Sequence, residues 1–305
     1  MRELANVTSA QPVPTVGFVG LGIMGAPMAR NLVRAGYRVV GHDVSPARVR
    51  QLVAEGGWAA DSVAAATDAE FVITMLPDSP QVEEVVLGPD GVLEHAKPGL
   101  VLIDMSTIRP QTSVRVARQA ADRGVRAIDA PVSGGEKGAI DGTLSIMVGG
   151  ATEDVEAARP VLDMLGRTVV HVGPSGAGQT VKAANQLVVG GTYALVAEAI
   201  VLLEASGVDA GPALDVLAGG LAGSRILELK RASMVAREFA PGFRIDLHHK
   251  DMGIAQDAAR AADVALPVTA LVAQLVAAAR AQGHGALDHS ALLLVAETLS
   301  GRNHR

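Results

Sequence analysis

Hydrophobic and polar positions follow two alternating patterns along the first 170 residues. Short runs rich in Val, Ile and Leu, such as TVGFVG from residue 15 and LVLIDMS from residue 100, are each followed by a longer segment with apolar residues at helical spacing. Consecutive parallel strands need a crossover connection, which a helix usually provides. The pattern therefore predicts an α/β fold, a doubly wound parallel sheet covered by helices on both faces.

The strand pattern stops near residue 172, and the rest of the chain reads as helices rich in Ala and Leu. The segment 173–207 is mostly apolar and predicts one long helix that opens the second half. We therefore expect three parts: a flexible tail at 1–14, an α/β domain at 15–174 and a helical domain at 175–305. We place the boundary at HVGPSGAG, just before the long helix.

Composition narrows the class of protein. A chain of 305 residues is long enough for two domains. Hydrophobic residues make up 49% of the chain and aromatic residues only 2%, which implies a core of Ala, Val, Leu and Ile. The net charge of −6 disfavours nucleic acid as a partner, and the lack of cysteine excludes disulfides and thiolate chemistry. The N-terminus lacks the apolar core of a signal peptide, so we expect a cytoplasmic protein that does not bind membranes.

A glycine-rich turn follows the first predicted strand, where TVGFVGLGIMG places Gly20, Gly22 and Gly25 in a GxGxxG pattern. The first glycine permits a tight turn, the second lets a pyrophosphate approach the backbone, and the third allows close packing of helix on strand. The pattern predicts a dinucleotide site that also includes the intervening residues Leu21, Ile23 and Met24.

An acidic residue supports this interpretation. Asp43 ends the second predicted strand, 18 residues beyond Gly25, close to the spacing of about 20 residues of a ribose-binding carboxylate. A carboxylate there accepts hydrogen bonds from the 2′-hydroxyl of NAD and repels the 2′-phosphate of NADP. We therefore expect NAD, with NADP as the alternative, because Arg48 and Arg50 lie close enough to weaken the preference.

The long helix carries a polar stripe. Helical spacing puts Gly178, Lys182, Asn185 and Gln186 on one face with Gln179 beside them, while the other faces are apolar. A lysine in a buried cleft loses hydration, so its pKa falls and it can exchange a proton near neutral pH. We interpret Gly178 as leaving room for a ligand. On pattern alone, a surface or salt-bridged Lys182 is an equal alternative.

The segment DAPVSGGEKGAIDGTLSIMVGG, residues 129–150, offers a second candidate site. Ser133 precedes the glycine pair Gly134 and Gly135, and small residues with free backbone N–H groups can surround a carboxylate. A plain hairpin connection explains the same pattern equally well.

Two further clusters carry no predicted chemistry. His248 and His249 are sequential and point in different directions, so we expect no metal site. The adjacent residues of the DHS sequence at 288–290 cannot align as a catalytic triad, and we interpret Asp288 as the N-cap of the following helix.

Four motifs in this order resemble the β-hydroxyacid dehydrogenase family: GFVGLGIMGAPMARNLVRAG, DAPVSGGEKGAIDGTLSIMVGG, GAGQTVKAANQ and FRIDLHHKDMGIA. The resemblance covers residues 15–300. It implies a dinucleotide-binding domain and a helical domain for substrate binding and oligomerisation, joined by one long helix and assembled as homodimers or homotetramers. It implies an NAD(P)-dependent oxidoreductase.

The resemblance also implies a role for each matched residue. Lys182 matches the catalytic general acid and base, and Asn185 matches the asparagine that orients the substrate. The substrate-binding set comprises Ser133, Gly134, Gly135 and Gln186. The remaining cofactor-binding residues are Met75, Leu76 and Pro77 in a turn, Thr107 beside the nicotinamide ribose, and Lys250, which closes over the cofactor.

Within the family the motifs resemble the tartronate semialdehyde reductase subgroup, because Gln186 stands where 3-hydroxyisobutyrate dehydrogenases carry asparagine. This implies reduction of 2-hydroxy-3-oxopropanoate to D-glycerate. The alternatives are a 3-hydroxyisobutyrate dehydrogenase and, more distantly, a non-catalytic NAD-binding sensor. The 6-phosphogluconate dehydrogenases share the lysine helix, but VKAANQ lacks their histidine-asparagine pair.

Overall fold

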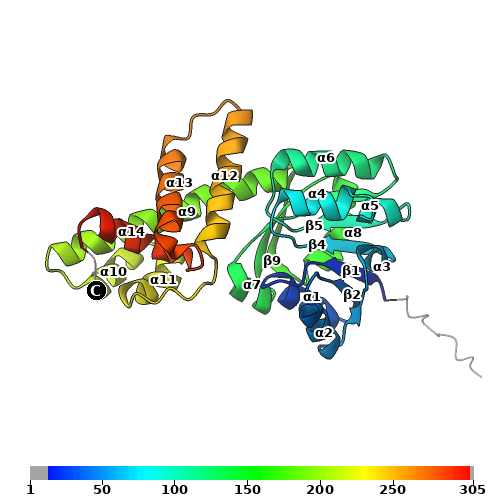
Figure 1. Cartoon of the computed structure of the whole chain (residues 1–305), viewed down its shortest axis with the longest axis horizontal. Helices are drawn as coiled ribbons and strands as arrows, with labels where there is room; N and C mark the ends of the chain where they lie inside the picture. Colours follow the sequence, from blue (N-terminus) through cyan, green and yellow to red (C-terminus); the bar gives the residue numbers. More distant parts are fainter. Residues whose placement is uncertain (1–12, 303–305) are drawn as a thin grey trace, which may run out of the picture.

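A computed structural model describes residues 13–302, so most of the tail predicted at 1–14 lies outside the described residues. Within this range the chain forms an α/β part and a helical part, and the long helix α9 (Ala177–Ala205) runs from one to the other (Figure 1). The predicted fold class is confirmed.

In the described residues the α/β part contains one sheet of nine strands: β1 (Thr15–Val19), β2 (Arg38–His42), β3 (Trp58–Ala59), β4 (Phe71–Thr74), β5 (Val101–Asp104), β6 (Arg126–Asp129), β7 (Val132–Ser133), β8 (Leu144–Gly149) and β9 (Gly166–Gly173). The first six are parallel and lie in the order β3-β2-β1-β4-β5-β6. This is the order of a dinucleotide-binding sheet, in which ligands bind beyond the carboxyl ends of the strands.

The sheet is not parallel throughout. Strand β8 runs antiparallel to both β6 and β7, while β9 is parallel to β8. The segment 129–150 therefore contains an antiparallel strand pair, as the interpretation as a hairpin connection predicts. It also carries a glycine turn, at Gly134 and Gly135, and the short helix α7 (Gly135–Asp141).

Helices cover the sheet and bury its apolar residues. They are α1 (Gly25–Arg34), α2 (Pro46–Ala54), α3 (Val63–Thr67), α4 (Ser79–Leu87), α5 (Val92–His95), α6 (Pro110–Ala121), α7 and α8 (Thr152–Leu162). Two apolar clusters lie against the sheet, one built around Phe18, Ile73 and Ile103 and the other around Val72 and Leu102. Alternating side chains of the strands therefore supply two cores, as expected of a sheet buried on both faces.

The helical part packs around α9. Its other elements are α10 (Ala210–Gly219), α11 (Arg225–Val235), α12 (Ile245–Ala261), α13 (Pro267–Ala279), the short turns η1 (Arg280–His284) and η2 (His289–Ala291), and α14 (Leu292–Leu299). Asp288 caps η2 as predicted, because its carboxylate accepts a hydrogen bond from the Ser290 amide.

Helix α9 is the one helix of the described range that is long and apolar enough to cross a membrane, with a mean hydropathy of 1.8 in its most apolar window. It packs on α12, α13 and α14, and its first turns lie against β8. These neighbours are those expected of the central helix of a packed domain.

Candidate active site

The glycine-rich turn has a backbone that only glycine fits at two of its three positions. Gly20 has a φ of 99°, and a Cβ there would lie 2.4 Å from the Met75 carbonyl oxygen. A Cβ on Gly25 would lie 1.9 Å from the carbonyl oxygen of Gly20. A Cβ on Gly22, by contrast, would lie 4.0 Å from its nearest neighbour, a nitrogen of the Arg48 guanidinium. Gly22 therefore has free space on the side where a side chain would stand.

This turn fits a dinucleotide phosphate. Helix α1 begins at Gly25, and no side chain caps its N-terminus, which leaves backbone N–H groups for an anion. The side chain of Leu21 is buried in the core, whereas that of Ile23 is exposed. Among these predicted residues, Leu21 therefore contributes only its backbone to the turn.

Asp43 holds the turn from the end of β2. Its carboxylate accepts hydrogen bonds from the backbone amides of Leu21 and Ser45, both at 2.8 Å, and lies 3.5 Å from the Arg48 guanidinium. The carboxylate is thus fixed beside the glycine-rich turn, where the spacing predicted it.

The neighbouring strand ends form the next part of the edge. Met75, Leu76 and Pro77 follow β4, and the Leu76 amide donates to the Ser106 hydroxyl at 2.9 Å. Thr107 follows β5, and its carbonyl oxygen accepts a hydrogen bond from Lys250 Nζ at 2.7 Å. The cofactor residues predicted on both parts of the chain therefore meet at one edge of the sheet.

Lys182 lies inside the molecule, with 6% of its surface exposed. Its Nζ donates to the carbonyl oxygen of Val132 at 2.7 Å and to Gln186 Oε1 at 3.0 Å. Val132 directly precedes Ser133, so the lysine touches the start of the glycine turn. Burial lowers the pKa of Lys182 to about 8, while Asp251 opposes this shift and Lys250 adds to it. The alternative of a surface lysine is therefore wrong.

Gln186 is the centre of a buried hydrogen-bond network. Its Oε1 accepts from Lys182 and, at 2.8 Å, from Asn185 Nδ2, while its Nε2 donates to Asp251 Oδ2 at 2.6 Å. Gln186 is 3% exposed. Its amide is thus engaged by protein groups, which fits orientation of Lys182 and Asn185 better than direct contact with a substrate.

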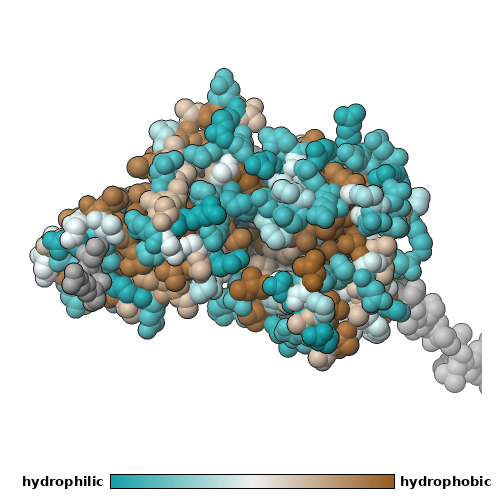
Figure 2. Space-filling model, in the orientation of Figure 1, coloured by the Kyte–Doolittle hydropathy of each residue, from teal (hydrophilic) through white to brown (hydrophobic). Residues whose placement is uncertain are grey.

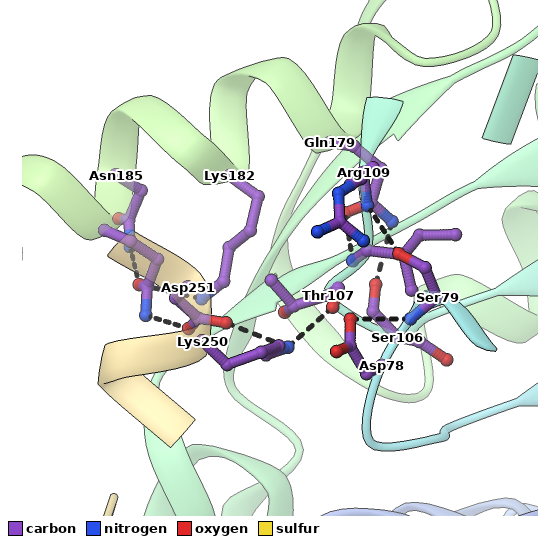
Figure 3. A network of polar contacts seen from close by, with 12 residues as sticks. Asp78, Ser79, Ser106, Thr107, Arg109, Gln179, Lys182, Asn185, Lys250 and Asp251 are labelled. Atoms are coloured by element: carbon purple, nitrogen blue, oxygen red, sulfur yellow. Dashed lines mark hydrogen bonds and ion pairs between the residues drawn. The ribbon is translucent and has the colours of Figure 1, made fainter. Parts of the chain in front are cut away.

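Asp251 is a site residue that sequence reasoning missed. It is 1% exposed and lies on α12, next to Lys250, whose Nζ is 2.9 Å from Asp251 Oδ1. Lys250 therefore links Asp251 to Thr107 across the two parts of the chain (Figure 3). The only signal in the sequence is that Asp251 belongs to the FRIDLHHKDMGIA motif.

The interpretation of Gly178 is wrong. A Cβ there would lie 2.4 Å from the Met147 carbonyl oxygen and 2.8 Å from Asp129 Oδ2, so the glycine makes room for the sheet and not for a ligand. Asp129, at the end of β6, accepts hydrogen bonds from the amides of Gly176 at 2.6 Å and Gln179 at 2.9 Å. It caps α9, which has no capping side chain of its own.

Gln179 also faces the sheet rather than the polar cluster. Its side chain accepts from the Ile108 amide and donates to the Ser106 carbonyl oxygen. The N-terminus of α9 is therefore attached to two strand ends, β5 and β6, and this attachment sets where Lys182 points.

The glycine turn after β7 has a backbone conformation that favours glycine. Gly134 and Gly135 have φ values of 136° and 61°, which few other residues adopt, and no atom lies within 4 Å of the position a Cβ would take on Gly135. The turn therefore presents open backbone beside Ser133, one residue beyond the carbonyl that Lys182 contacts.

A dinucleotide-binding sheet edge thus stands opposite a buried lysine of lowered pKa, and together they define a nicotinamide-dependent oxidoreductase. Comparison with known proteins agrees. Residues 15–173 match the NAD binding domain of 6-phosphogluconate dehydrogenase, and residues 176–296 match the NAD-binding domain of NADP-dependent 3-hydroxyisobutyrate dehydrogenase.

Two curated relatives and one solved structure resemble the whole chain. The 2-hydroxy-3-oxopropionate reductase of Escherichia coli is 42% identical, over 95% of this chain and 99% of its own, and the 2-(hydroxymethyl)glutarate dehydrogenase of Eubacterium barkeri is 41% identical, over 94% and 96%. The structure of Mycobacterium tuberculosis 3-hydroxyisobutyrate dehydrogenase with L-serine has a TM-score of 0.85 at 36% identity, over 93% and 99%. The chain belongs to the β-hydroxyacid dehydrogenase family and is an NAD(P)-dependent hydroxyacid dehydrogenase.

Proposed function

We propose that the protein reduces a short semialdehyde acid, 2-hydroxy-3-oxopropanoate, to D-glycerate with Lys182 as the proton donor. The observation that carries this proposal is the buried Lys182, in contact with the carbonyl that precedes the Ser133 turn. A group whose pKa lies near the working pH is an effective general acid and base.

Each group of the site has a defined task in this proposal. The bound nicotinamide cofactor supplies the hydride. Ser133 Oγ and the amides of Gly134 and Gly135 bind the substrate carboxylate, and Asn185 orients the substrate. Lys182 Nζ gives its proton to the carbonyl oxygen during reduction and removes the hydroxyl proton during oxidation. Holding these groups in one geometry accounts for much of the rate.

Each predicted cofactor residue also has a defined task in this proposal. Backbone N–H groups from Gly20 to Gly25 would hold the pyrophosphate at the start of α1. The turn at Met75, Leu76 and Pro77 would contact the cofactor beyond β4, with Thr107 beside the nicotinamide ribose and Lys250 closing over it. Asp43 would accept the ribose hydroxyls, which favours NAD over NADP.

The choice of substrate rests on Gln186 and on the relative at 42% identity, a 2-hydroxy-3-oxopropionate reductase. A 3-hydroxyisobutyrate dehydrogenase is the second candidate, because the similar solved structure bears that name. Gln186 differs from the asparagine of that subgroup by one methylene, which lets its amide reach both Lys182 and Asp251.

Substrate and cofactor can be tested together. We would measure NADH consumption with tartronate semialdehyde beside NAD reduction with 3-hydroxyisobutyrate, and repeat both with the phosphorylated cofactors. Preference for tartronate semialdehyde and NADH supports the proposal. If only 3-hydroxyisobutyrate reacts, the proposed substrate is wrong and 3-hydroxyisobutyrate takes its place. If neither compound reacts although NADH binds, the proposed function is refuted.

We also propose that the protein works in the cytoplasm as a homo-oligomer, with its domains divided at 174 and 175. Val181, Val188, Leu195 and Leu202 are exposed at seven-residue intervals along α9, which places them in one stripe. Beside it lies a hollow of about 440 Å³ between α9, α13 and α14, and apolar side chains gather over this end of the molecule (Figure 2). A second copy of the chain would cover this surface.

A further inference from the structure

Two buried histidines lie directly behind Gln186, and the proposed reaction assigns them no task. His248 on α12 is fully buried, and His289 in η2 is 7% exposed. Their Nδ1 atoms are 3.1 Å apart, and His248 Nε2 lies 3.3 Å from the backbone carbonyl oxygen of Gln186. The pair therefore connects η2 through α12 to the helix that carries Lys182.

The contacts fix which nitrogens carry protons. A carbonyl oxygen only accepts hydrogen bonds, so His248 must carry its proton on Nε2. In a neutral ring Nδ1 is then an acceptor, and His289 must donate its Nδ1–H to it. Burial lowers the pKa of both rings, so both are neutral near pH 7. One arrangement of protons satisfies the pair.

Packing holds the two rings in place. The Tyr193 ring lies 3.9 Å from that of His289 between centroids, and the Phe243 ring lies 5.3 Å from it. A Cβ on Gly190 would stand 3.1 Å from His248 Nε2. The absence of a side chain at Gly190 therefore lets His248 reach the backbone of α9.

His248 and Asp251 occupy one face of α12, three residues apart. His248 holds the backbone carbonyl of Gln186, and Asp251 accepts a hydrogen bond from the Gln186 side chain. Because a carboxylate only accepts, Asp251 turns the amide nitrogen of Gln186 toward itself and the oxygen toward Lys182. Helix α12 thus binds Gln186 at both ends.

We propose that the His248–His289 pair is a positioning element for the reaction: it sets α12 against α9 so that Asp251 orients Gln186 and Gln186 orients Lys182. This inference rests on the proposed role of Lys182 as proton donor. Neither histidine touches the substrate in this account.

The charged groups around the two histidines determine how loss of the pair would change the pKa of Lys182. Lys182 faces it from α9, Asp251 from α12, Asp288 from η2 and Lys230 from α11. Gln186 Oε1 stabilises the charged form of Lys182 by accepting its N–H, and Asp251 does so by its charge. Lys250 on the same helix lowers the pKa of Lys182, but by less than Asp251 raises it. If α12 shifts away, the larger effect of Asp251 and the hydrogen bond to Gln186 weaken, and the pKa of Lys182 falls further.

The test uses two substitutions of His289 that differ in one property. His289→Phe keeps a ring against Tyr193 and Phe243 but removes the Nδ1 donor, whereas the amide of His289→Asn can still donate near that position. We expect His289→Phe to lower kcat of reduction by about tenfold or more and to move the basic limb of its pH profile to lower pH. His289→Asn should restore both toward wild type.

A purely structural role would lower the amount of folded protein without moving the pH limb. The proposal is overturned if His289→Phe keeps the wild-type kcat and pH limb, or if kcat falls while the limb stays in place and asparagine does not rescue it. The pKa of Lys182, measured by NMR on labelled lysine with cofactor bound, gives the same comparison without turnover. An inactive wild type would refute the function, while this comparison would still decide the role of the pair.

The wild-type protein provides an independent test in case the variants do not fold. NMR of selectively labelled histidine reports the tautomer of each ring. We expect His248 protonated on Nε2, His289 protonated on Nδ1, and both rings neutral at pH 7. The opposite tautomers, or a charged ring at pH 7, would overturn the proposal.

Discussion

In the proposed mechanism the chemistry depends on Lys182, and the burial of this residue gives the reaction a defined pH dependence. The pKa of Lys182 is lowered to about 8 because burial disfavours the charged amine. If Lys182 is the proton donor, reduction requires its protonated form, present below this pKa, whereas oxidation requires its neutral form, present above it.

We therefore predict opposite pH limbs for the two directions. The kcat for reduction should fall as pH rises through about 8, and the kcat for oxidation should rise over the same range. Steady-state kinetics between pH 6 and pH 10 measure both. Limbs of the same sign, or no change near pH 8, would remove Lys182 from the proton transfer.

Asp129 caps the start of α9, the helix that carries Lys182. Burial raises the pKa of Asp129 to about 6, although the amides of Gly176 and Gln179 stabilise its charged form. At neutral pH it is thus a carboxylate opposite the N-terminus of α9, where a negative charge is favourable.

We predict that Asp129→Asn destabilises the protein by about 1–3 kcal/mol, since an amide cannot accept from both N–H groups as the carboxylate does. The kcat should fall by about tenfold, because the start of the lysine helix would move. Asp141→Asn, which changes an exposed i,i+4 ion pair with Lys137, is the matched control. Thermal unfolding measures the change in stability, and steady-state kinetics measure the change in kcat. An unchanged kcat would contradict the idea that the Asp129 cap positions the helix that carries Lys182.

At the scale of elements, the packing of α12 on α9 depends on one glycine. A Cβ on Gly190 would lie 3.0 Å from Val272 Cγ1 and 3.1 Å from His248 Nε2, whereas one on Gly191 would meet no atom within 4 Å. Gly190 and Gly191 are thus adjacent glycines of one helix with different surroundings.

Gly190→Ala should therefore destabilise the protein by about 1–3 kcal/mol through overpacking. Gly191→Ala should leave stability unchanged or raise it slightly, because alanine favours a helix over glycine by about 0.5–1 kcal/mol. The two melting temperatures test this directly. Equal effects of both substitutions would mean that the α9–α12 contact is not tight.

Local patterns predicted those elements whose chemistry is local. The glycine-rich turn, Asp43 at the end of β2 and the neighbours Lys182, Asn185 and Gln186 follow from spacing along a strand or helix, and the structure places them as expected. Gly178 and Gln179, predicted on the same stripe, face the sheet instead. The partners of these residues could not be predicted, because they lie far away in the chain. Asp251 meets Gln186 across 65 residues, and Asp129 meets Gln179 across 50.

The same limit explains the errors. The interpretation of Gly178 as space for a ligand fails because its neighbour Met147 comes from a strand about 30 residues earlier, which local spacing does not reveal. The antiparallel strand β8 differs from its parallel neighbours in direction, which strand composition does not encode. Glycines at Gly134 and Gly135 fit both a hairpin turn and a binding loop, and the structure combines a turn with an antiparallel pair.

At the scale of the whole molecule, two contacts cross between the sheet and α12. Lys250 reaches the Thr107 carbonyl, and Arg109 pairs with Asp257 at 3.0 Å. Both lie at the edge where the cofactor residues meet. The relative placement of the two parts therefore depends on α9 and on these contacts near the site.

The exposed stripe of α9 predicts the assembly state. We expect the wild-type protein to be a dimer or larger oligomer and Leu195→Glu to shift it toward the monomer, because a charge would replace an exposed leucine at the centre of the stripe. Light scattering after size exclusion measures the mass of each. A monomeric wild type would contradict this surface as the interface.

Comparing Lys182→Ala with wild type in cofactor binding and in turnover decides whether Lys182 is the proton donor. We predict that Lys182→Ala keeps an NADH affinity within about twofold of wild type and loses about 10²–10⁴-fold in kcat. Lys137→Ala, which replaces an exposed lysine, should keep wild-type turnover. Wild-type turnover in Lys182→Ala, or loss of NADH binding as the cause of inactivity, would contradict the role of Lys182 as proton donor.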